Sequence, residues 1–429
     1  MLFSRWAGAG RRESRFVALA ALITALATVL AAQGAQAQQL RGDGGVPAFY
    51  SWSGRVTGGP GKLLRNEPLS EVGQLANAAT NVRILYTSTD GLTGKGRVVV
   101  SGALYLPRGT PPRGGWPLLA WAHGTVGVAD ICAPSFAGRS ARDVTYLNFW
   151  LAQGYAVVAS DYQGLGTPGG HPYLDTRSAS FSVLDSVRAV QRDKTWPLSK
   201  KVVLIGQSQG GGAAFATAAY APAYAPDLDV RGAVATGTPY FSPAAQVALD
   251  AARPKDTVDP LLGYGFYVLS LLEQSEPGFH FEDFISDRAL PLVRTSGATC
   301  FTNLARQITT AALTYNLSYK ADISPYTAKA YAHMGYPTLR IKKPVFMGTG
   351  GSDRDVPPGM QLQLGADACA AGSTIEQHLY AGLDHSGTVN GSTGESSVFV
   401  RKAFAGEKIT GNCNARPSLP PPASGAPGR

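Results

Sequence analysis

Hydrophobic positions along the chain follow two periodic patterns that predict its secondary structure. The stretch 96–106 alternates apolar side chains with polar or small ones, as a half-buried strand does, and it follows a shorter apolar stretch at 83–87. After residue 116, apolar stretches of strand length, such as 117–122 and 155–160, are separated by helix-length stretches with one apolar face. This alternation predicts an α/β fold: a mostly parallel central sheet with helices on both faces, preceded by an antiparallel strand pair.

One long interruption and two flanking regions divide the chain. From 239 to 338 the alternation of strand-length and helix-length stretches is absent, and apolar residues occur on more than one helical face. This pattern predicts an inserted, mainly helical cap. The core would then consist of residues 38–238 and 339–412, with an irregular, Gly-rich beginning at 38–81. Residues 413–429 are predicted to form a Pro- and Gly-rich tail, of which 416–429 is expected to lack fixed structure. The other predicted elements are helices at 144–153, 178–192 and 397–405 and strands at 202–205, 230–236, 344–348 and 374–380.

The N-terminus has the organisation of a secretory signal peptide. Four arginines precede an apolar stretch at 16–32, which is shorter than the ~20 residues that comfortably span a bilayer. Ala35, Gln36 and Ala37 then have the small-x-small form of a cleavage site. We therefore expect residues 1–37 to be removed and the protein to be secreted or periplasmic.

Composition indicates a folded protein with a large core and disfavours one class of partner, nucleic acids. The chain has 44% hydrophobic and 16% charged residues, so the roughly 390 residues after the leader can bury a large core. The leader, with four arginines and one glutamate, accounts for three units of the formal net charge of +9, and the remaining basic residues form only short groups. Nucleic-acid binding is therefore disfavoured, whereas transient contact with a lipid surface is compatible with this charge. The oligomeric state does not follow from the sequence.

Cysteine and histidine spacing favours disulfides over metal ligands. The chain has four cysteines without a CxxC pair, and in an exported protein four cysteines indicate two disulfides, for which three pairings are possible. The six histidines include no HExxH or similar spacing, so no metal site and no cofactor are expected. A GxGxxG match at 164–169 is rejected as a dinucleotide site, because Pro168 and Pro172 leave no helix N-terminus for a pyrophosphate.

The strongest chemical signal is the pentapeptide GQSQG at 206–210. It follows the apolar stretch 202–205 and precedes the small residues 211–219, which predicts a strand, a sharp turn and a helix. A nucleophile elbow needs this context, because glycines let the crossing backbones approach the turn. We therefore predict Ser208 as the nucleophile; the alternative is a glycine-rich turn without chemistry.

Asp353 and His385 are the predicted partners of Ser208. A nucleophilic serine needs a general base and a carboxylate that orients this base, and on folds with such an elbow the chain order is serine, acid, histidine. Asp353 follows the predicted strand 344–348, and His385 lies in a short loop after the last strand. Loops at the carboxyl edge of a sheet commonly carry catalytic residues, so these three residues form the predicted triad. Asp355 is interpreted as a loop acid that caps the following helix.

A tetrahedral intermediate also needs two backbone N–H donors. One is predicted at Gln209, which follows the nucleophile, and the other at Thr125 or Gly124, in the turn after strand 117–122. The neighbouring His123 is expected to brace this turn and to take no part in the chemistry.

Several further motifs are spread over the chain. They are DICAPS at 130–135, SDYQG at 160–164, CAAG at 369–372 and the residues around Cys413. Together with the elbow, they resemble the secretory lipase family of α/β-hydrolases. The resemblance implies an α/β-hydrolase fold and places the family's serine, aspartate and histidine on the three predicted triad residues.

The resemblance also implies the cysteine pairing, with bridges Cys132–Cys300 and Cys369–Cys413. In the family's well-known yeast member the elbow ends in two adjacent glycines and the oxyanion turn is acidic, whereas this chain has Gln209 and a His-Gly-Thr turn. Since the sequence ends soon after the last cysteine, we expect no counterpart of the yeast protein's long C-terminal flap and do not carry over interfacial activation.

These observations predict an exported serine carboxylic-ester hydrolase, a lipase or esterase that forms an acyl-enzyme on Ser208. The apolar cap favours acyl or aromatic esters over charged substrates. Two alternatives stay open. One is a peptidase or acyltransferase on the same fold, since a triad distinguishes neither ester from amide nor water from another acceptor. The other is a non-catalytic binding protein on a hydrolase scaffold.

Overall fold

The computed structural model describes residues 40, 42–243, 249 and 253–419. The predicted signal peptide and residues 420–429 of the predicted tail lie outside this part of the chain. Within the described ranges, no helix is both long and apolar enough to cross a membrane.

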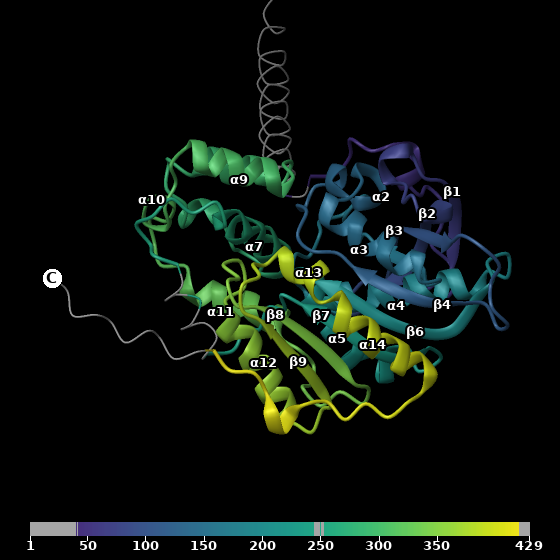
Figure 1. Cartoon of the computed structure of the whole chain (residues 1–429). Helices are drawn as coiled ribbons and strands as arrows, with labels where there is room; N and C mark the ends of the chain where they lie inside the picture. Colours follow the sequence, from purple (N-terminus) through teal and green to yellow (C-terminus); the bar gives the residue numbers. More distant parts are fainter. Residues whose placement is uncertain (1–39, 41, 244–248, 250–252, 420–429) are drawn as a thin grey trace, which may run out of the picture.

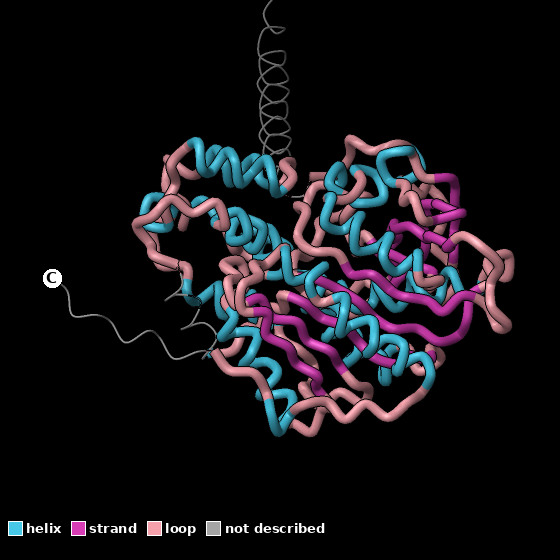
Figure 2. The backbone as a smooth tube through the Cα atoms, viewed as in Figure 1, coloured by secondary structure: helices cyan, strands magenta, loops and turns pink. Residues whose placement is uncertain are grey.

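A nine-stranded sheet forms the centre of the molecule (Figures 1 and 2). Its strands in chain order are β1 (Leu63–Pro68), β2 (Ala78–Thr89), β3 (Arg97–Pro107), β4 (Trp116–Ala122), β5 (Ala156–Ser160), β6 (Leu198–Gln207), β7 (Asp229–Thr236), β8 (Val345–Gly350) and β9 (Ile375–Tyr380). Across the sheet the order is β1-β2-β3-β5-β4-β6-β7-β8-β9. The pairs β1–β2, β2–β3 and β3–β5 are antiparallel, and all later pairs are parallel. This is the mostly parallel sheet with an antiparallel beginning that the sequence predicts.

Each central strand sends alternate side chains into two cores on opposite faces of the sheet. In β4, Leu118 and Ala120 belong to one core, whereas Leu119 and Trp121 belong to the other. The first core is covered by α4 (Thr176–Arg192), α5 (Gln209–Tyr224) and α12 (Pro358–Ala370), and the second by α3 (Ala141–Ala152) and α14 (Thr393–Ala405). Burial on both faces is the reason why these strands are continuous apolar stretches in the sequence. The short helices α2 (Pro134–Ala137) and α13 (Gly387–Gly391) lie in connecting segments.

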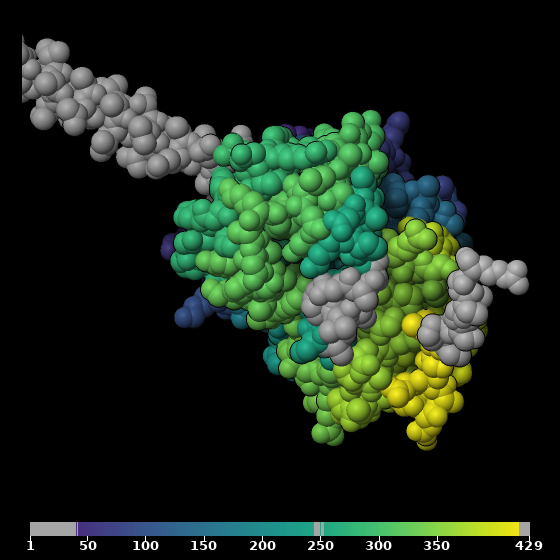
Figure 3. All heavy atoms as spheres, turned by 90° about the vertical axis from the view of Figure 1, so that its left-hand side faces the viewer, coloured from purple at the N-terminus to yellow at the C-terminus, as the bar shows by residue number. Residues whose placement is uncertain are grey.

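Between β7 and β8 the described residues form a mainly helical segment, called the cap. Its helices are α7 (Leu262–Ser275), α8 (Leu290–Ser296), α9 (Phe301–Thr310), α10 (Tyr315–Ser318) and α11 (Ser324–Met334). They enclose a hydrophobic core of their own around Phe266, Tyr267 and Ile308, which are fully buried. In Figure 3 the cap, in green, covers the upper part of the face turned to the viewer.

A disulfide ties the cap to the core. The bridge Cys132–Cys300 joins the residue before α9 to the loop that follows β4. Beside it, the Phe301 N–H donates a hydrogen bond of 2.8 Å to the Val126 carbonyl. The start of α9 is therefore fixed to the loop that also carries the predicted oxyanion turn.

A second attachment of the cap depends on pH. At the end of α11, His333 Nδ1 lies 3.0 Å from Oδ2 of Asp175, the residue before α4. The hydrogen bond to Asp175 raises the pKa of His333 above its ordinary value. The contribution of this pair is therefore fully present below about pH 6.5, the ordinary histidine pKa, and is lost as pH rises through the raised pKa. We expect His333→Gln to lower the melting temperature by about 1–2 °C at about pH 5.5 and by less at about pH 8.5.

Thermal unfolding followed by circular dichroism at the two pH values measures this difference. His280→Gln, which replaces an exposed histidine of the same cap, is the matched control. An equal loss of melting temperature at both pH values would show that His333 acts through packing alone.

The prediction for the beginning of the chain is wrong. The stretch 38–81, predicted to be irregular, contains β1 and the start of β2. As an edge strand, β1 pairs with β2 along one side, and its register shifts between Leu63 and Arg65. Because such a strand is half exposed and bulged, its sequence lacks the regular alternation that would have identified it.

The first three residues of the predicted tail, before the part expected to lack fixed structure, belong to the folded protein. Residues Cys413–Ala415 form the short helix η5, and the disulfide Cys369–Cys413 attaches it to the end of α12. The last cysteine therefore belongs to the folded core.

Candidate active site

Ser208 lies in a sharp turn between β6 and α5. Its backbone has φ +60° and ψ −124°, with φ in a range that residues other than glycine rarely adopt. The crossing backbones leave no room for neighbouring side chains: a Cβ on Gly206 would lie 2.0 Å from the Gly210 carbonyl oxygen, and one on Gly210 would lie 1.9 Å from the Ala122 carbonyl oxygen. The glycines of the pentapeptide thus permit the strained turn that a nucleophile elbow requires.

Asp353 and His385 are hydrogen-bonded to each other. His385 Nδ1 lies 2.7 Å from Asp353 Oδ2, and both side chains are buried. Asp353 also accepts a hydrogen bond from Gln361 Nε2 at 2.8 Å and from the backbone N–H groups of Asp355 and Val356 at 2.9 Å. Because the carboxylate can only accept here, Nδ1 of the imidazole carries the proton and Nε2 is left as an acceptor.

The elbow and the Asp353–His385 pair meet at the end of β7. The Ser208 N–H donates to the Thr236 carbonyl at 2.9 Å. The next residue, Gly237, passes so close to His385 that a Cβ there would lie 2.8 Å from Cε1 of the imidazole. His385 Nε2 is buried and has no hydrogen-bond partner among the described residues. The three residues predicted as a triad are thus brought to one edge of the sheet.

The predicted oxyanion donors border the elbow. Gln209 is the first residue of α5, so its backbone N–H has no acceptor within the helix. A Cβ on Gly124 would lie 3.4 Å from Cβ of Ser208, which places the turn after β4 directly against the nucleophile. The following residue, Thr125, is held by a hydrogen bond of 2.7 Å between its Oγ1 and the Tyr173 hydroxyl.

Two buried histidines brace these turns. Burial lowers the pKa of both His123 and His171 to about 4, so both are neutral at neutral pH. His123 Nδ1 lies 2.7 Å from the Gly124 carbonyl, in agreement with the predicted bracing role. His171 Nδ1 donates to the Gln163 carbonyl at 2.9 Å, which leaves its Nε2 to accept from Gln209 Nε2 at 3.0 Å. No local sequence signal points to this contact, because the two residues are distant in sequence.

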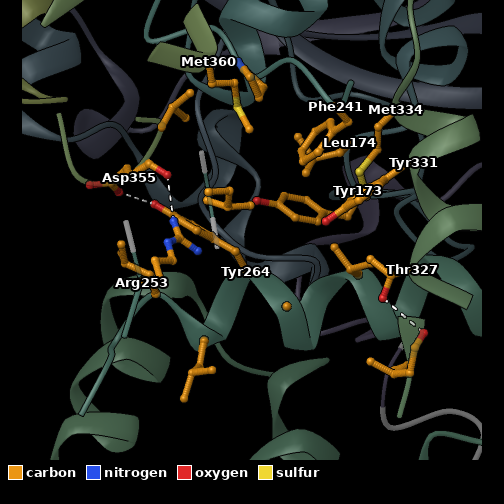
Figure 4. A pocket seen from close by; sticks show the side chains of 18 of the residues that line it. Tyr173, Leu174, Phe241, Arg253, Tyr264, Thr327, Tyr331, Met334, Asp355 and Met360 are labelled. Atoms are coloured by element: carbon orange, nitrogen blue, oxygen red, sulfur yellow. Dashed lines mark hydrogen bonds between the residues drawn. The ribbon is translucent and has the colours of Figure 1, made fainter. Parts of the chain in front are cut away.

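A cavity of about 790 Å³ opens between core and cap, and Ser208, Gln209 and Thr125 contribute to its wall. Figure 4 shows part of this wall, with Leu174, Phe241 and Met334 among the labelled side chains. Most of the wall is apolar and comes from the cap and the loops beneath it. Its apolar lining includes Leu174, Phe241, Leu261, Val268, Ile323 and Met334. A space of this size and character fits a substrate with an extended apolar part.

One part of the wall is polar. Tyr264 donates its hydroxyl to Asp355 Oδ2 at 2.7 Å, and Arg253 Nη2 donates to the Asp355 backbone carbonyl at 2.7 Å (Figure 4). The interpretation of Asp355 as a helix cap is therefore wrong: α12 begins after Pro357 without a side-chain cap, and Asp355 faces the cavity. Burial and the neighbouring Asp355 raise the pKa of Tyr264 far above its ordinary value, so its hydroxyl stays a donor.

The described ranges contain no group of three or more His, Cys, Asp or Glu side chains that could hold a metal ion.

Comparison with known proteins finds one matching family and related proteins. Residues 139–412 match the protein family described as Secretory lipase. Lipase A of Moesziomyces aphidis is 24% identical over 388 residues, which span 83% of this chain and 79% of that protein. A Mycobacterium tuberculosis protein named as a probable inactive lipase is 29% identical over 246 residues, which span 54% of this chain and 52% of that protein.

Solved structures share the fold. Candida antarctica lipase A superposes with a TM-score of 0.69 at 21% identity, covering 87% of this chain and 89% of that one. The rice cell wall degrading esterase LipA of Xanthomonas oryzae superposes with a TM-score of 0.65 at 20% identity, covering 82% of this chain and 100% of that one. The architecture is thus that of the α/β-hydrolases.

Proposed function

Because the chain belongs to the secretory lipase family of lipase- and esterase-type hydrolases, we propose that it is an exported serine carboxylic-ester hydrolase. In this proposal Ser208 is the nucleophile, His385 the general base and Asp353 the residue that orients His385. The backbone N–H groups of Gln209 and Thr125 form the oxyanion hole. No metal or organic cofactor takes part.

The observation that carries the proposal is the imidazole of His385, which has one hydrogen-bonded nitrogen and one without a partner in the described ranges, and lies at the same edge of the sheet as the strained Ser208. The carboxylate of Asp353 holds Nδ1 of His385, while Nε2 is buried without a partner among the described residues. A buried acceptor without a hydrogen-bond partner is rare in folded proteins, and a catalytic role is one explanation for it. The hydroxyl of Ser208 is the donor that this arrangement calls for, and catalytic hydrogen bonds commonly tighten only when substrate binds.

The reaction then follows from these positions. His385 Nε2 removes the hydroxyl proton as Ser208 Oγ attacks the ester carbonyl, and the resulting imidazolium is stabilised by Asp353. The carbonyl oxygen becomes an oxyanion held by two backbone N–H groups, each worth about 3–4 kcal/mol of barrier. Collapse of the intermediate breaks the ester C–O bond, and the proton on Nε2 passes to the leaving alcohol. Water, deprotonated by the same nitrogen, releases the acid and restores the serine.

The cavity supports an ester with an apolar part. Its aliphatic and aromatic lining lies next to Ser208, so a hydrocarbon chain or ring bound there would place its ester carbonyl at the elbow. Both disulfides, Cys132–Cys300 and Cys369–Cys413, support an exported protein, because such bridges persist in oxidising compartments.

A peptidase or acyltransferase on the same fold is the second candidate, since the proposed machinery would also cleave amides or acylate alcohols. The third candidate is a non-catalytic binding protein on this scaffold. It has to be tested because the mycobacterial relative is named as a probable inactive lipase. The proposal differs from the third candidate in requiring a reactive serine.

The test is the initial rate of purified mature protein on p-nitrophenyl esters from acetate to palmitate, together with labelling by a fluorophosphonate. We expect hydrolysis and labelling of Ser208. A peak at long chains would identify a lipase, and a peak at acetate or butyrate an esterase. Labelling with turnover only on amides, or only with added alcohols, would favour the second candidate, whereas no labelling of the folded protein would overturn the proposal.

A further inference from the structure

The polar part of the cavity wall has a cation that the proposed ester chemistry does not use. We propose that Arg253 binds a carboxylate carried by the substrate, so that the preferred esters are half-esters of dicarboxylic acids with an apolar chain between ester and acid. This inference rests on the proposed ester hydrolysis and adds the chemical class of the acyl group.

Arg253 has unused hydrogen-bonding capacity. Its Nη2 donates to the Asp355 backbone carbonyl, whereas its Nε is buried and has no partner among the described residues. None of the ion pairs found in the described ranges includes Arg253. A guanidinium has five N–H donors in a fixed fork, and an unpaired, partly buried cation is unfavourable until an anion pairs with it.

The acids on the same wall are already engaged. Asp355 Oδ2 accepts the hydroxyl of Tyr264, and Asp259 Oδ1 accepts the backbone N–H of Leu261 at 2.9 Å. A second cation, Lys255, also contributes to this wall. None of the ion pairs among the described residues joins these two cations to these two acids, so Arg253 keeps N–H donors that no carboxylate of the described wall takes up.

The cation lies in the same cavity as the nucleophile. Ser208 and Arg253 both contribute to its wall, and the Asp355 carbonyl that anchors Arg253 is two residues after Asp353. Figure 4 shows Arg253 and Tyr264 directed toward Asp355, with Tyr173 farther along the cavity. Since the hydroxyl of Tyr173 bonds to Thr125 in the oxyanion turn, a ligand spanning this wall connects the cation with the elbow.

A carboxylate is the group that fits this arrangement. The planar guanidinium fork matches a carboxylate in two parallel hydrogen bonds, which gives orientation as well as affinity. The apolar lining between the two ends suits methylene groups. A half-ester therefore satisfies the cation, the apolar wall and the nucleophile together, whereas a fully esterified acid leaves the cation unpaired.

The experiment compares monoethyl suberate with diethyl suberate, which have the same chain and differ in one charge. We expect the wild-type kcat/KM to be higher for the half-ester. Arg253→Gln should lower kcat/KM for the half-ester by about 10- to 100-fold, mainly through KM, and change that for the diester by less than about threefold. Arg253→Lys, which keeps the charge but not the fork, should recover only part of this loss.

Arg354→Gln is the matched control, because it removes an equal charge beside Asp353 from an exposed side chain. A wild-type preference for the diester, or an equal fall for both esters in Arg253→Gln, would overturn the inference. Calorimetric binding of monoethyl suberate to Ser208→Ala separates the two proposals. Binding that needs Arg253, without hydrolysis by the wild type, would contradict ester hydrolysis and keep the carboxylate site; the absence of such binding would contradict the site itself.

Discussion

Replacing Ser208 with alanine is expected to lower kcat for ester hydrolysis by about 10⁴- to 10⁶-fold while leaving the fold intact. The variant removes the only atom that the proposed mechanism joins to the acyl group, so what remains is the stabilisation of the oxyanion and the binding of the substrate. The strained backbone at φ +60° is also no less suited to alanine than to serine. Burst and steady-state rates on a p-nitrophenyl ester measure the effect, and circular dichroism verifies the fold.

Ser296→Ala is the matched control for this variant. Its hydroxyl is fully buried in the cap and donates to the Val293 carbonyl at 2.7 Å, so its loss tests the general effect of removing a buried hydroxyl. Activity within about twofold of the wild type is expected for the control. Substantial hydrolysis by purified Ser208→Ala would show that another residue is the nucleophile.

Replacing Asp353 with asparagine should lower kcat by about 10⁴-fold. An asparagine amide at this position can donate to Nδ1 of His385, which would move the ring proton to Nε2, the nitrogen that has to accept the serine proton. The two backbone N–H groups and Gln361, which now donate to the carboxylate, would meet an amide in which only the carbonyl oxygen accepts. We therefore also expect a lower melting temperature.

The measurement is kcat over a range of pH for Asp353→Asn beside Asp384→Asn. Asp384 is exposed, directly precedes His385 and accepts the Gly387 N–H at 2.7 Å, so its variant controls for local charge and loop structure. If both variants lost activity equally, or if Asp353→Asn lost less than about tenfold, orientation of the histidine by Asp353 would be contradicted.

The central architecture is predictable from the sequence because burial determines both the place of a strand in the sheet and the apolar character of its residues. The inner strands of the sheet are covered on both faces, so stretches such as 117–122 and 202–205 must be apolar throughout. The elbow is equally visible, since the close approach at Gly206 and Gly210 excludes every other residue type. Local steric requirements therefore give the sequence signals that lead to Ser208.

Other parts depend on contacts between residues far apart in the chain. The hydrogen bond between His171 and Gln209 has no local signal, and neither does the cluster of Arg253, Tyr264 and Asp355. These side chains are polar residues of loops and cap helices, whose sequences fit many surroundings equally well. The sequence also does not reveal which cap residues reach the cavity, so the place of Arg253 in its wall has no sequence signal.

The bridge Cys132–Cys300 has a consequence for where the protein can work. It fixes the start of α9 to the loop that carries Thr125, and the hydrogen bond from Phe301 to Val126 continues this attachment toward the oxyanion turn. In a reducing cytoplasm the two thiols stay separate. A chain still inside the cell that makes it would then lack the tether that holds the loop of the proposed oxyanion donor. If the protein is exported as proposed, the site would be completed only after export, which would protect the esters of the producing cell.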